Sequence, residues 1–198
     1  FVVRLKPAFS RLGLYLMRVW VEVKRYGFNV YVGSLASVAS AQMGGVLLAF
    51  FVDTKNAGFF LLARTITSPL VELSTAIGTS FFKKFSGAAI IKPNIFVFSI
   101  ASVSLMLLGF ELLISSAVML LYPPDFMEIV SMCRIMAVGS AFQGLGGLIN
   151  NFVCARGYGK YSRNASLVRG GVNLIGFTLG VMFFGVQGAA WTVLASGL

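Results

Sequence analysis

The chain has 198 residues, of which 58% are hydrophobic and 11% are charged. Soluble domains contain about 45–50% apolar and about 25% charged residues, so this composition, with a mean hydropathy of +0.88, excludes a soluble globular protein. The net charge of +10 would suggest a nucleic-acid-binding protein only if the basic residues lay on one soluble surface.

Residues 1–26 are predicted to form a basic amphipathic helix. Arg4, Arg11 and Arg18 recur every seven positions and share one helix face, whereas Trp20 lies on the apolar face. This pattern is typical of a helix that lies on a membrane surface, and a solvated linker is the alternative. A secretory signal is excluded because basic residues interrupt the apolar stretch.

Five apolar stretches follow, and each is long enough for a membrane-spanning helix of about 20 residues. They cover residues 28–52, 57–82, 94–122, 126–155 and 167–184, and residues 188–198 open a sixth. The predicted fold class is therefore all-α, a polytopic transmembrane helical bundle over residues 27–198 with about five complete spans and a truncated sixth. Pro69 is expected to kink the second span. Both chain ends look cut, so we expect a piece of a longer protein.

The connecting segments alternate in charge. Basic residues gather before the first span, after the second and after the fourth, whereas the other connections carry few charges or none. The segment after the fourth span contains Arg156, Lys160, Arg163 and Arg169. The positive-inside rule assigns the three basic segments, and with them the start of the chain, to the cytoplasm. Because all connections are short, we expect no inserted catalytic domain and no enzyme.

Four ionisable residues fall deep inside the predicted spans, away from the span ends, where each costs several kcal/mol unless it is paired or hydrated. They are Arg64, Glu72, Glu111 and Arg134. On the second span, Arg64, Ser68 and Glu72 recur every four positions, and Thr75 and Thr79 continue the same face. We interpret this polar stripe as the wall of an aqueous cavity. The alternative is that Arg64 reaches the interface, Glu72 pairs with a neighbouring helix, and the Ser and Thr hydroxyls bond the backbone of their own helix.

Arg134 is predicted to lie at a depth similar to that of Arg64. Two guanidinium groups at one level suit a diphosphate, because planar forks bind phosphate oxygens in pairs. An equally supported alternative pairs Arg134 with Glu128 or with headgroups. Glu111 is predicted to be a counter-ion to an arginine or an ion-coupling carboxylate. The candidate substrate-binding residues are Arg64, Ser68, Glu72 and Arg134, and the candidate ion-coupling residues are Glu72 and Glu111.

The fourth span carries a mildly polar seam. It consists of Ser140, Gln143, Gly147, Asn150 and Cys154. We interpret the seam first as helix–helix hydrogen bonding, with substrate contact as the alternative. No metal and no cofactor are expected, because the sequence has no histidine and only two cysteines. Cys133 and Cys154 are about 31 Å apart along one helix, too far to form a disulfide.

Several stretches of sequence carry a family resemblance, and one of them is GVQGAAWTVLASGL, which resembles the start of a further span. Basic residues and an aromatic precede a small-residue span in KRYGFNVYVGSLASVASAQMGGVLLAFFV. An initial Gly-aromatic pair, an arginine, a mid-helix proline and a basic end follow one another in NAGFFLLARTITSPLVELSTAIGTSFFKKFS. FQGLGGLINNFVCARGYGKYSRNASLVRGGVNLIGF joins two spans through a basic loop. These stretches resemble the polysaccharide-biosynthesis flippases, including the O-antigen exporters, of the multidrug/oligosaccharidyl-lipid/polysaccharide (MOP) superfamily.

The resemblance implies two helical bundles around a central cavity, with residues 27–198 as the second bundle and residues 1–26 as the linker. It implies that the protein flips an undecaprenyl-diphosphate-linked oligosaccharide across the bacterial cytoplasmic membrane by alternating access. Arg64 matches the family pattern as a cationic cavity residue. The implied partners are the lipid-linked oligosaccharide, membrane lipids and the remaining N-terminal bundle of the same protein, and no nucleic acid.

Three alternatives remain open. A cation-coupled multidrug exporter of the same superfamily would depend on carboxylates to bind cationic drugs, and Glu72 and Glu111 could supply them. A non-catalytic assembly subunit would only pack against a partner. An integral-membrane enzyme acting on the same lipid carrier would need a sizeable catalytic loop, and the connecting segments are too short to supply one.

Overall fold

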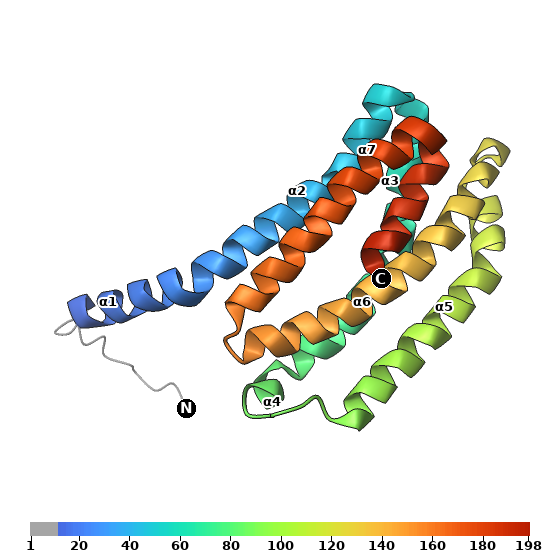
Figure 1. Cartoon of the computed structure of the whole chain (residues 1–198). Helices are drawn as coiled ribbons and strands as arrows, with labels where there is room; N and C mark the ends of the chain where they lie inside the picture. Colours follow the sequence, from blue (N-terminus) through green and yellow to red (C-terminus); the bar gives the residue numbers. More distant parts are fainter. Residues whose placement is uncertain (1–11) are drawn as a thin grey trace.

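The computed structural model describes residues 12–198, and all regular structure in that range is helical (Figure 1). The elements are α1 (Leu12–Glu22), the π-helical segment η2 (Val23–Gly27), α2 (Phe28–Phe51), α3 (Thr54–Ser80), α4 (Phe82–Ser86), α5 (Pro93–Leu121), the 3-10 turn η3 (Pro124–Glu128), α6 (Ile129–Ala155) and α7 (Gly159–Gly197). The predicted all-α polytopic bundle is confirmed. Residues 1–11 of the predicted amphipathic helix, including Arg4 and Arg11, lie outside the described range.

A capped turn separates α2 from α3. The carboxylate of Asp53 accepts hydrogen bonds from the backbone N of Asn56 at 2.6 Å and from its Nδ2 at 2.7 Å. These bonds satisfy a free N–H in the first turn of α3. Because they favour the charged carboxylate, they lower the pKa of Asp53. The sequence therefore ends one helix and starts the next within three residues.

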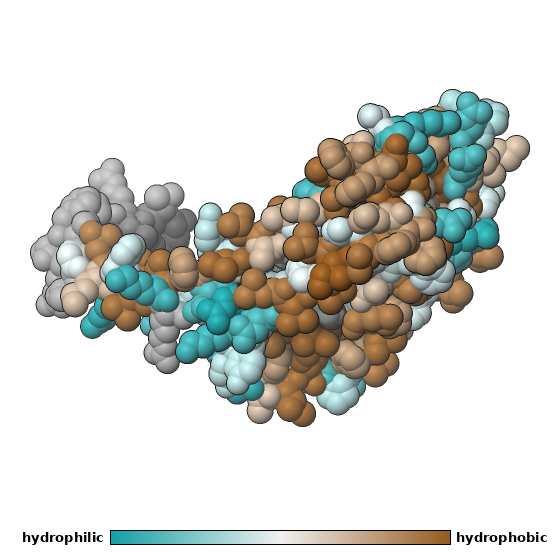
Figure 2. Space-filling model, turned by 45° about the horizontal axis from the view of Figure 1, so that its top comes forward, coloured by the Kyte–Doolittle hydropathy of each residue, from teal (hydrophilic) through white to brown (hydrophobic). Residues whose placement is uncertain are grey.

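Four stretches of the described chain are long and apolar enough to cross a membrane. They are α2, α5, η3 with α6, and α7. Apolar side chains cover most of the visible surface, and polar ones gather toward its two ends (Figure 2). At 27 residues α3 is about 40 Å long and could also span the bilayer core, but its polar stripe lowers its hydropathy. This helix packs against α2 and α6 inside the bundle.

α7 consists of two antiparallel arms. The chain reverses at Gly185, whose φ of 57° and ψ of −134° require a glycine. The first arm begins at Gly159 rather than at the predicted residue 167, and the second arm ends in the middle of the bundle (Figure 1). The arms touch through glycines, since a Cβ on Gly180 would lie 2.8 Å from the Gly188 carbonyl oxygen. The predicted break between a fifth and a sixth span is therefore confirmed.

The core lies where α2 packs on α7 and α3 packs on α6. Phe60 and Phe177 meet edge to face, with 5.9 Å between ring centroids, and both are almost completely buried. Gly44 makes room for them, because a Cβ there would lie 2.8 Å from Cε1 of Phe177. Close helix approach through small residues, which membrane bundles favour, holds α2 against α7.

Candidate functional site

A cavity of about 170 Å³ lies inside the bundle, where α2, α3, α6 and both arms of α7 meet. Its wall combines charged, amide and hydroxyl side chains with a few apolar ones. The lining residues are Ala41, Arg64, Ser68, Val71, Glu72, Ser140, Gln143, Arg169, Asn173, Phe177, Val193 and Ser196. A polar cavity inside an apolar bundle is the usual place for a ligand site in a membrane protein.

The polar stripe of α3 supplies one wall of this cavity. Arg64, Ser68 and Glu72, predicted from their spacing to share a face, all reach the lining. The stripe does not line the cavity along its full length. Thr75 and Thr79 instead donate to the carbonyls of Val71 and Ala76 in their own helix, at 3.0 Å each. The first three residues of the stripe therefore follow the cavity interpretation, and the two threonines follow the alternative.

Arg64 is anchored to a second helix. Its Nη1 donates a hydrogen bond to the backbone carbonyl of Ala41 in α2, and the side chain is half-buried. One side of the guanidinium is therefore held by the backbone of α2, while the same residue lines the cavity. A fixed guanidinium is suited to bind an anion because its orientation is set before the ligand arrives.

Arg169 brings a second guanidinium to the same cavity from α7. Its Nε is buried and has no hydrogen-bond partner among residues 12–198. A buried donor of this kind is costly unless a ligand or water satisfies it. Arg169 and Arg64 line the same cavity, so their two positive charges repel each other. The α3 and α7 walls therefore present paired positive charges to the cavity.

Among the described residues that line the cavity, Glu72 is the only one with a carboxylate. Among residues 12–198 a single ion pair lies within 4.0 Å, and it is located elsewhere in the bundle. Glu72 therefore neutralises neither arginine directly. With two arginines and one carboxylate, the lining as a whole is electropositive. Because charges interact strongly in a medium of low dielectric constant, an anion would stabilise it.

Two amide side chains complete the polar wall. Asn173 is buried and its Nδ2 donates to Ser40 Oγ at 3.4 Å. Gln143 of α6 reaches the same lining and has no hydrogen-bond partner among the described residues. Part of the seam on the fourth span, Ser140 with Gln143, therefore faces the cavity rather than a helix interface.

Arg134 and Glu111 are paired with each other at a different place. Arg134 Nε lies 3.4 Å from Glu111 Oε2, and an Nη of Arg134 donates to Ser115 Oγ at 3.2 Å. Neither residue belongs to the lining that contains Arg64. The structure therefore does not place Arg134 beside Arg64, and it gives Arg134 a partner on α5 rather than Glu128.

Arg169 is the main residue that the sequence interpretation left out. The sequence places it in a basic cytoplasmic segment, whereas the structure places it ten residues inside α7. A signal was present, because Arg169, Asn173 and Phe177 recur every four positions on one helix face. The sequence interpretation assigned Arg169 to a loop because three other basic residues, Arg156, Lys160 and Arg163, precede it closely.

Searches of the sequence against protein-family models and against curated proteins found no match. The structure, in contrast, is similar to two solved transporters at 16% sequence identity. One is a multidrug-resistance MATE family transporter of the MOP superfamily in an outward-facing conformation, with a TM-score of 0.68. The other is a MOP superfamily transporter from Pyrococcus furiosus, whose binding pocket is described as having reverse polarity, with a TM-score of 0.67.

Each match covers 89% of this chain and 42% of the solved transporter. The chain therefore spans less than half the length of the proteins that it resembles. At this level of identity the likeness establishes the fold: a helical bundle arranged as in part of a MOP superfamily transporter. This confirms the helical-bundle fold that the sequence resemblance implied for the present chain.

Proposed function

We propose that this chain forms one half of a transporter that flips an undecaprenyl-diphosphate-linked oligosaccharide across the bacterial cytoplasmic membrane. The observation that carries the proposal is a pair of guanidinium groups, those of Arg64 and Arg169, which line one cavity and form no ion pair with any carboxylate of the described chain. A diphosphate is an anion with several oxygens on neighbouring centres. Two planar forks can each bind two of those oxygens, which gives both affinity and orientation.

The energetic cost of the site supports an anionic substrate. Charges that have no counter-ion inside a membrane cost several kcal/mol each, so they are expected only where a ligand or water compensates them. The unsatisfied Nε of Arg169 and the free amide of Gln143 add donors for phosphate oxygens or sugar hydroxyls. In this proposal the lipid tail stays in the bilayer while the diphosphate enters the cavity.

The transport cycle is proposed to follow alternating access. A second bundle, the N-terminal half of the same protein, would close the cavity from the other side. Rocking of the two bundles would then expose the substrate first to the cytoplasm and later to the outer leaflet. The basic end of the bundle, where α7 begins, is assigned to the cytoplasm by the positive-inside rule.

The direct test replaces Arg64 in the complete protein. Arg64→Ala should abolish surface polysaccharide and cause the lipid-linked precursor to accumulate, while the amount of protein in the membrane stays unchanged. Arg134→Gln is the matched control, because it removes an intramembrane arginine that lies outside the cavity. Normal polysaccharide in the Arg64→Ala strain would refute the proposal.

A cation-coupled multidrug exporter is the second candidate. The observation in its favour is Glu72, a carboxylate in the cavity wall that could bind a cationic drug or a coupling ion. For that function Glu72→Gln should abolish drug resistance and Arg64→Ala should leave it intact. For a flippase the Arg64 substitution should have the larger effect. Profiling the drug resistance of both variants beside the polysaccharide assay separates the two functions.

A further inference from the structure

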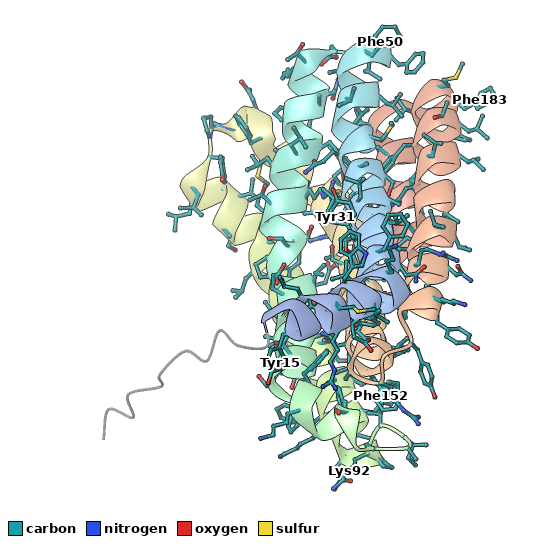
Figure 3. All side chains as sticks on the ribbon, turned by 90° about the vertical axis from the view of Figure 1, so that its left-hand side faces the viewer. Tyr15, Tyr31, Phe50, Lys92, Phe152 and Phe183 are labelled. Atoms are coloured by element: carbon teal, nitrogen blue, oxygen red, sulfur yellow. The ribbon has the colours of Figure 1, made fainter. Side chains whose placement is uncertain are left out.

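α1 leaves the bundle, and within the described part of the chain it packs substantially against η2 alone. It runs across the direction of the bundle helices, which stand upright between Phe50 and Phe183 at one end and Phe152 and Lys92 at the other (Figure 3). Its described side chains are exposed, including Tyr15, Leu16 and Trp20 at 60% each. Something outside the described chain must cover these apolar side chains in the native environment.

The two sides of α1 differ in chemistry. At 100° per residue, Leu16, Trp20 and Val23 fall on one face, and Arg18 and Glu22 fall on the opposite face. Lys24 reaches back over the Trp20 ring, with 5.3 Å from Nζ to the ring centroid. A wide apolar face, a basic edge and a tryptophan between them are the features of a helix that lies in the membrane interface.

The junction after α1 holds its angle to the bundle. The Tyr26 hydroxyl in η2 donates to the carbonyl of Cys154 at the end of α6, at 3.0 Å. The Tyr26 ring packs on Gly159, where a Cβ would lie 2.8 Å from Cδ2 of the ring. One turn further on, Arg163 donates to Asn29 Oδ1 at 2.7 Å. These contacts tie η2 and the start of α2 to the start of α7.

The same junction is basic and aromatic. Arg156 lies over the rings of Phe152 and Tyr158, at 5.8 Å and 5.3 Å, and Lys160 is exposed close by in sequence. Tyr158 and Tyr161 stack edge to face and are exposed. No acidic residue occurs between Glu128 and the end of the chain. Basic heads beside tyrosine and tryptophan rings complement anionic lipid headgroups at the level of the interface.

We propose that α1 lies flat in the surface of the leaflet on the basic side of the bundle and that, with Lys24, Arg156 and Lys160, it forms a binding surface for anionic phospholipid headgroups. The apolar face of α1 would cover the acyl-chain boundary while the basic side chains contact phosphates. The inference is independent of the transported substrate, because it uses no residue of the cavity.

Two tryptophans, Trp20 and Trp191, allow a direct test. The Trp191→Phe substitution leaves Trp20 as the one tryptophan in residues 1–198. This variant is reconstituted into vesicles of phosphatidylcholine and phosphatidylglycerol. Two sets of vesicles are compared, one with brominated phosphatidylcholine and the other with brominated phosphatidylglycerol, at the same mole fraction of brominated lipid. We expect brominated phosphatidylglycerol to quench Trp20 more strongly than brominated phosphatidylcholine. Salt should reduce the preference, because it shortens the range of the electrostatic attraction.

A charge substitution and a matched control complete the design. Lys24→Gln in the same background should lower the preference by up to about fivefold, the effect of one basic residue near an anionic surface. The converse protein, with Trp20→Phe and Trp191 retained, should show no preference, because Trp191 lies on the second arm of α7. Equal quenching of Trp20 by both lipids would overturn the proposal. So would an absence of quenching, which would mean that another protein segment covers α1.

Discussion

Arg134 of α6 and Glu111 of α5 form an ion pair across their helix interface, with 3.4 Å between Nε and Oε2. Both side chains are partly exposed, at 52% and 34%, and lie outside the cavity that Arg64 lines. The pair thus accounts for two of the four charges that the sequence places inside the membrane. It leaves Arg64, Glu72 and the unanticipated Arg169 as the charges available for binding.

The Arg134–Glu111 pair is expected to stabilise the protein slightly and to leave transport intact. Arg134→Gln and Glu111→Gln should each lower the melting temperature in detergent. Because the pair is partly exposed, their coupling in a double-mutant cycle should stay below about 1 kcal/mol. Polysaccharide export should persist in both single variants. Loss of export with an unchanged melting temperature would instead assign one of these residues to substrate binding or ion coupling.

Arg169 is predicted to be as important for transport as Arg64. Loss of a charge-assisted hydrogen bond costs about 1.5–3 kcal/mol, so Arg169→Ala should slow flipping by about 10- to 100-fold. Arg169→Lys should recover part of the rate, since it keeps the charge but loses the planar fork. Arg163→Ala serves as the control, because that arginine bonds Asn29 at the helix junction. Flipping of a fluorescent lipid-diphosphate in proteoliposomes measures all three rates.

The hairpin of α7 should depend on glycine at position 185. Its φ of 57° with ψ of −134° is a region that other residues occupy only at a cost of about 1–3 kcal/mol. Gly185→Ala should therefore lower the melting temperature although open space surrounds the site. Gly171→Ala lies in the same helix, also in open space, and should be neutral or slightly stabilising. Equal behaviour of the two variants would show that the turn tolerates a side chain.

Gly144 is expected to set the distance between α6 and α3. A Cβ at this position would lie 2.9 Å from the carbonyl oxygen of Leu70, and backbone atoms cannot move aside as a flexible side chain can. Gly144→Ala should therefore destabilise the bundle by about 1–3 kcal/mol. Gly146→Ala, two residues along, meets nothing within 4 Å and is the matched control. Thermal unfolding in one detergent compares the two, and similar melting temperatures would contradict close α3–α6 packing.

Tyr26 should make stability depend on alkaline pH. Burial, together with the hydrogen bond to Cys154, raises the pKa of Tyr26 from its ordinary value of 10 to about 12. A raised pKa in the folded state stabilises the protein fully below pH 10, and this contribution is lost as the pH rises toward 12. Tyr26→Phe should thus be less stable than the parent below pH 10, and the difference should shrink above it. Melting temperatures across this range test the expectation, with Tyr31→Phe as the control.

Hydropathy was sufficient to predict the long spanning helices, but not α4 or the start of α7. A spanning helix must satisfy its own backbone hydrogen bonds in lipid and therefore shows a long apolar stretch. The spacing of Arg64, Ser68 and Glu72 also predicted correctly that they share one face. Both results depend on distances within a single helix, which the helical repeat determines.

Contacts between helices were decided by the tertiary structure. Arg134 is predicted from the sequence to lie at a depth similar to that of Arg64, yet the rotation of α6 turns it toward Glu111. No sequence pattern within one helix determines that rotation. Arg169 resembled part of a loop until α7 proved to begin at Gly159. The sequence by itself thus determined which segments are helices and which residues share a face. Only the packing of the helices, set by close contacts such as those of Gly44 and Gly144, decided which faces meet around the cavity.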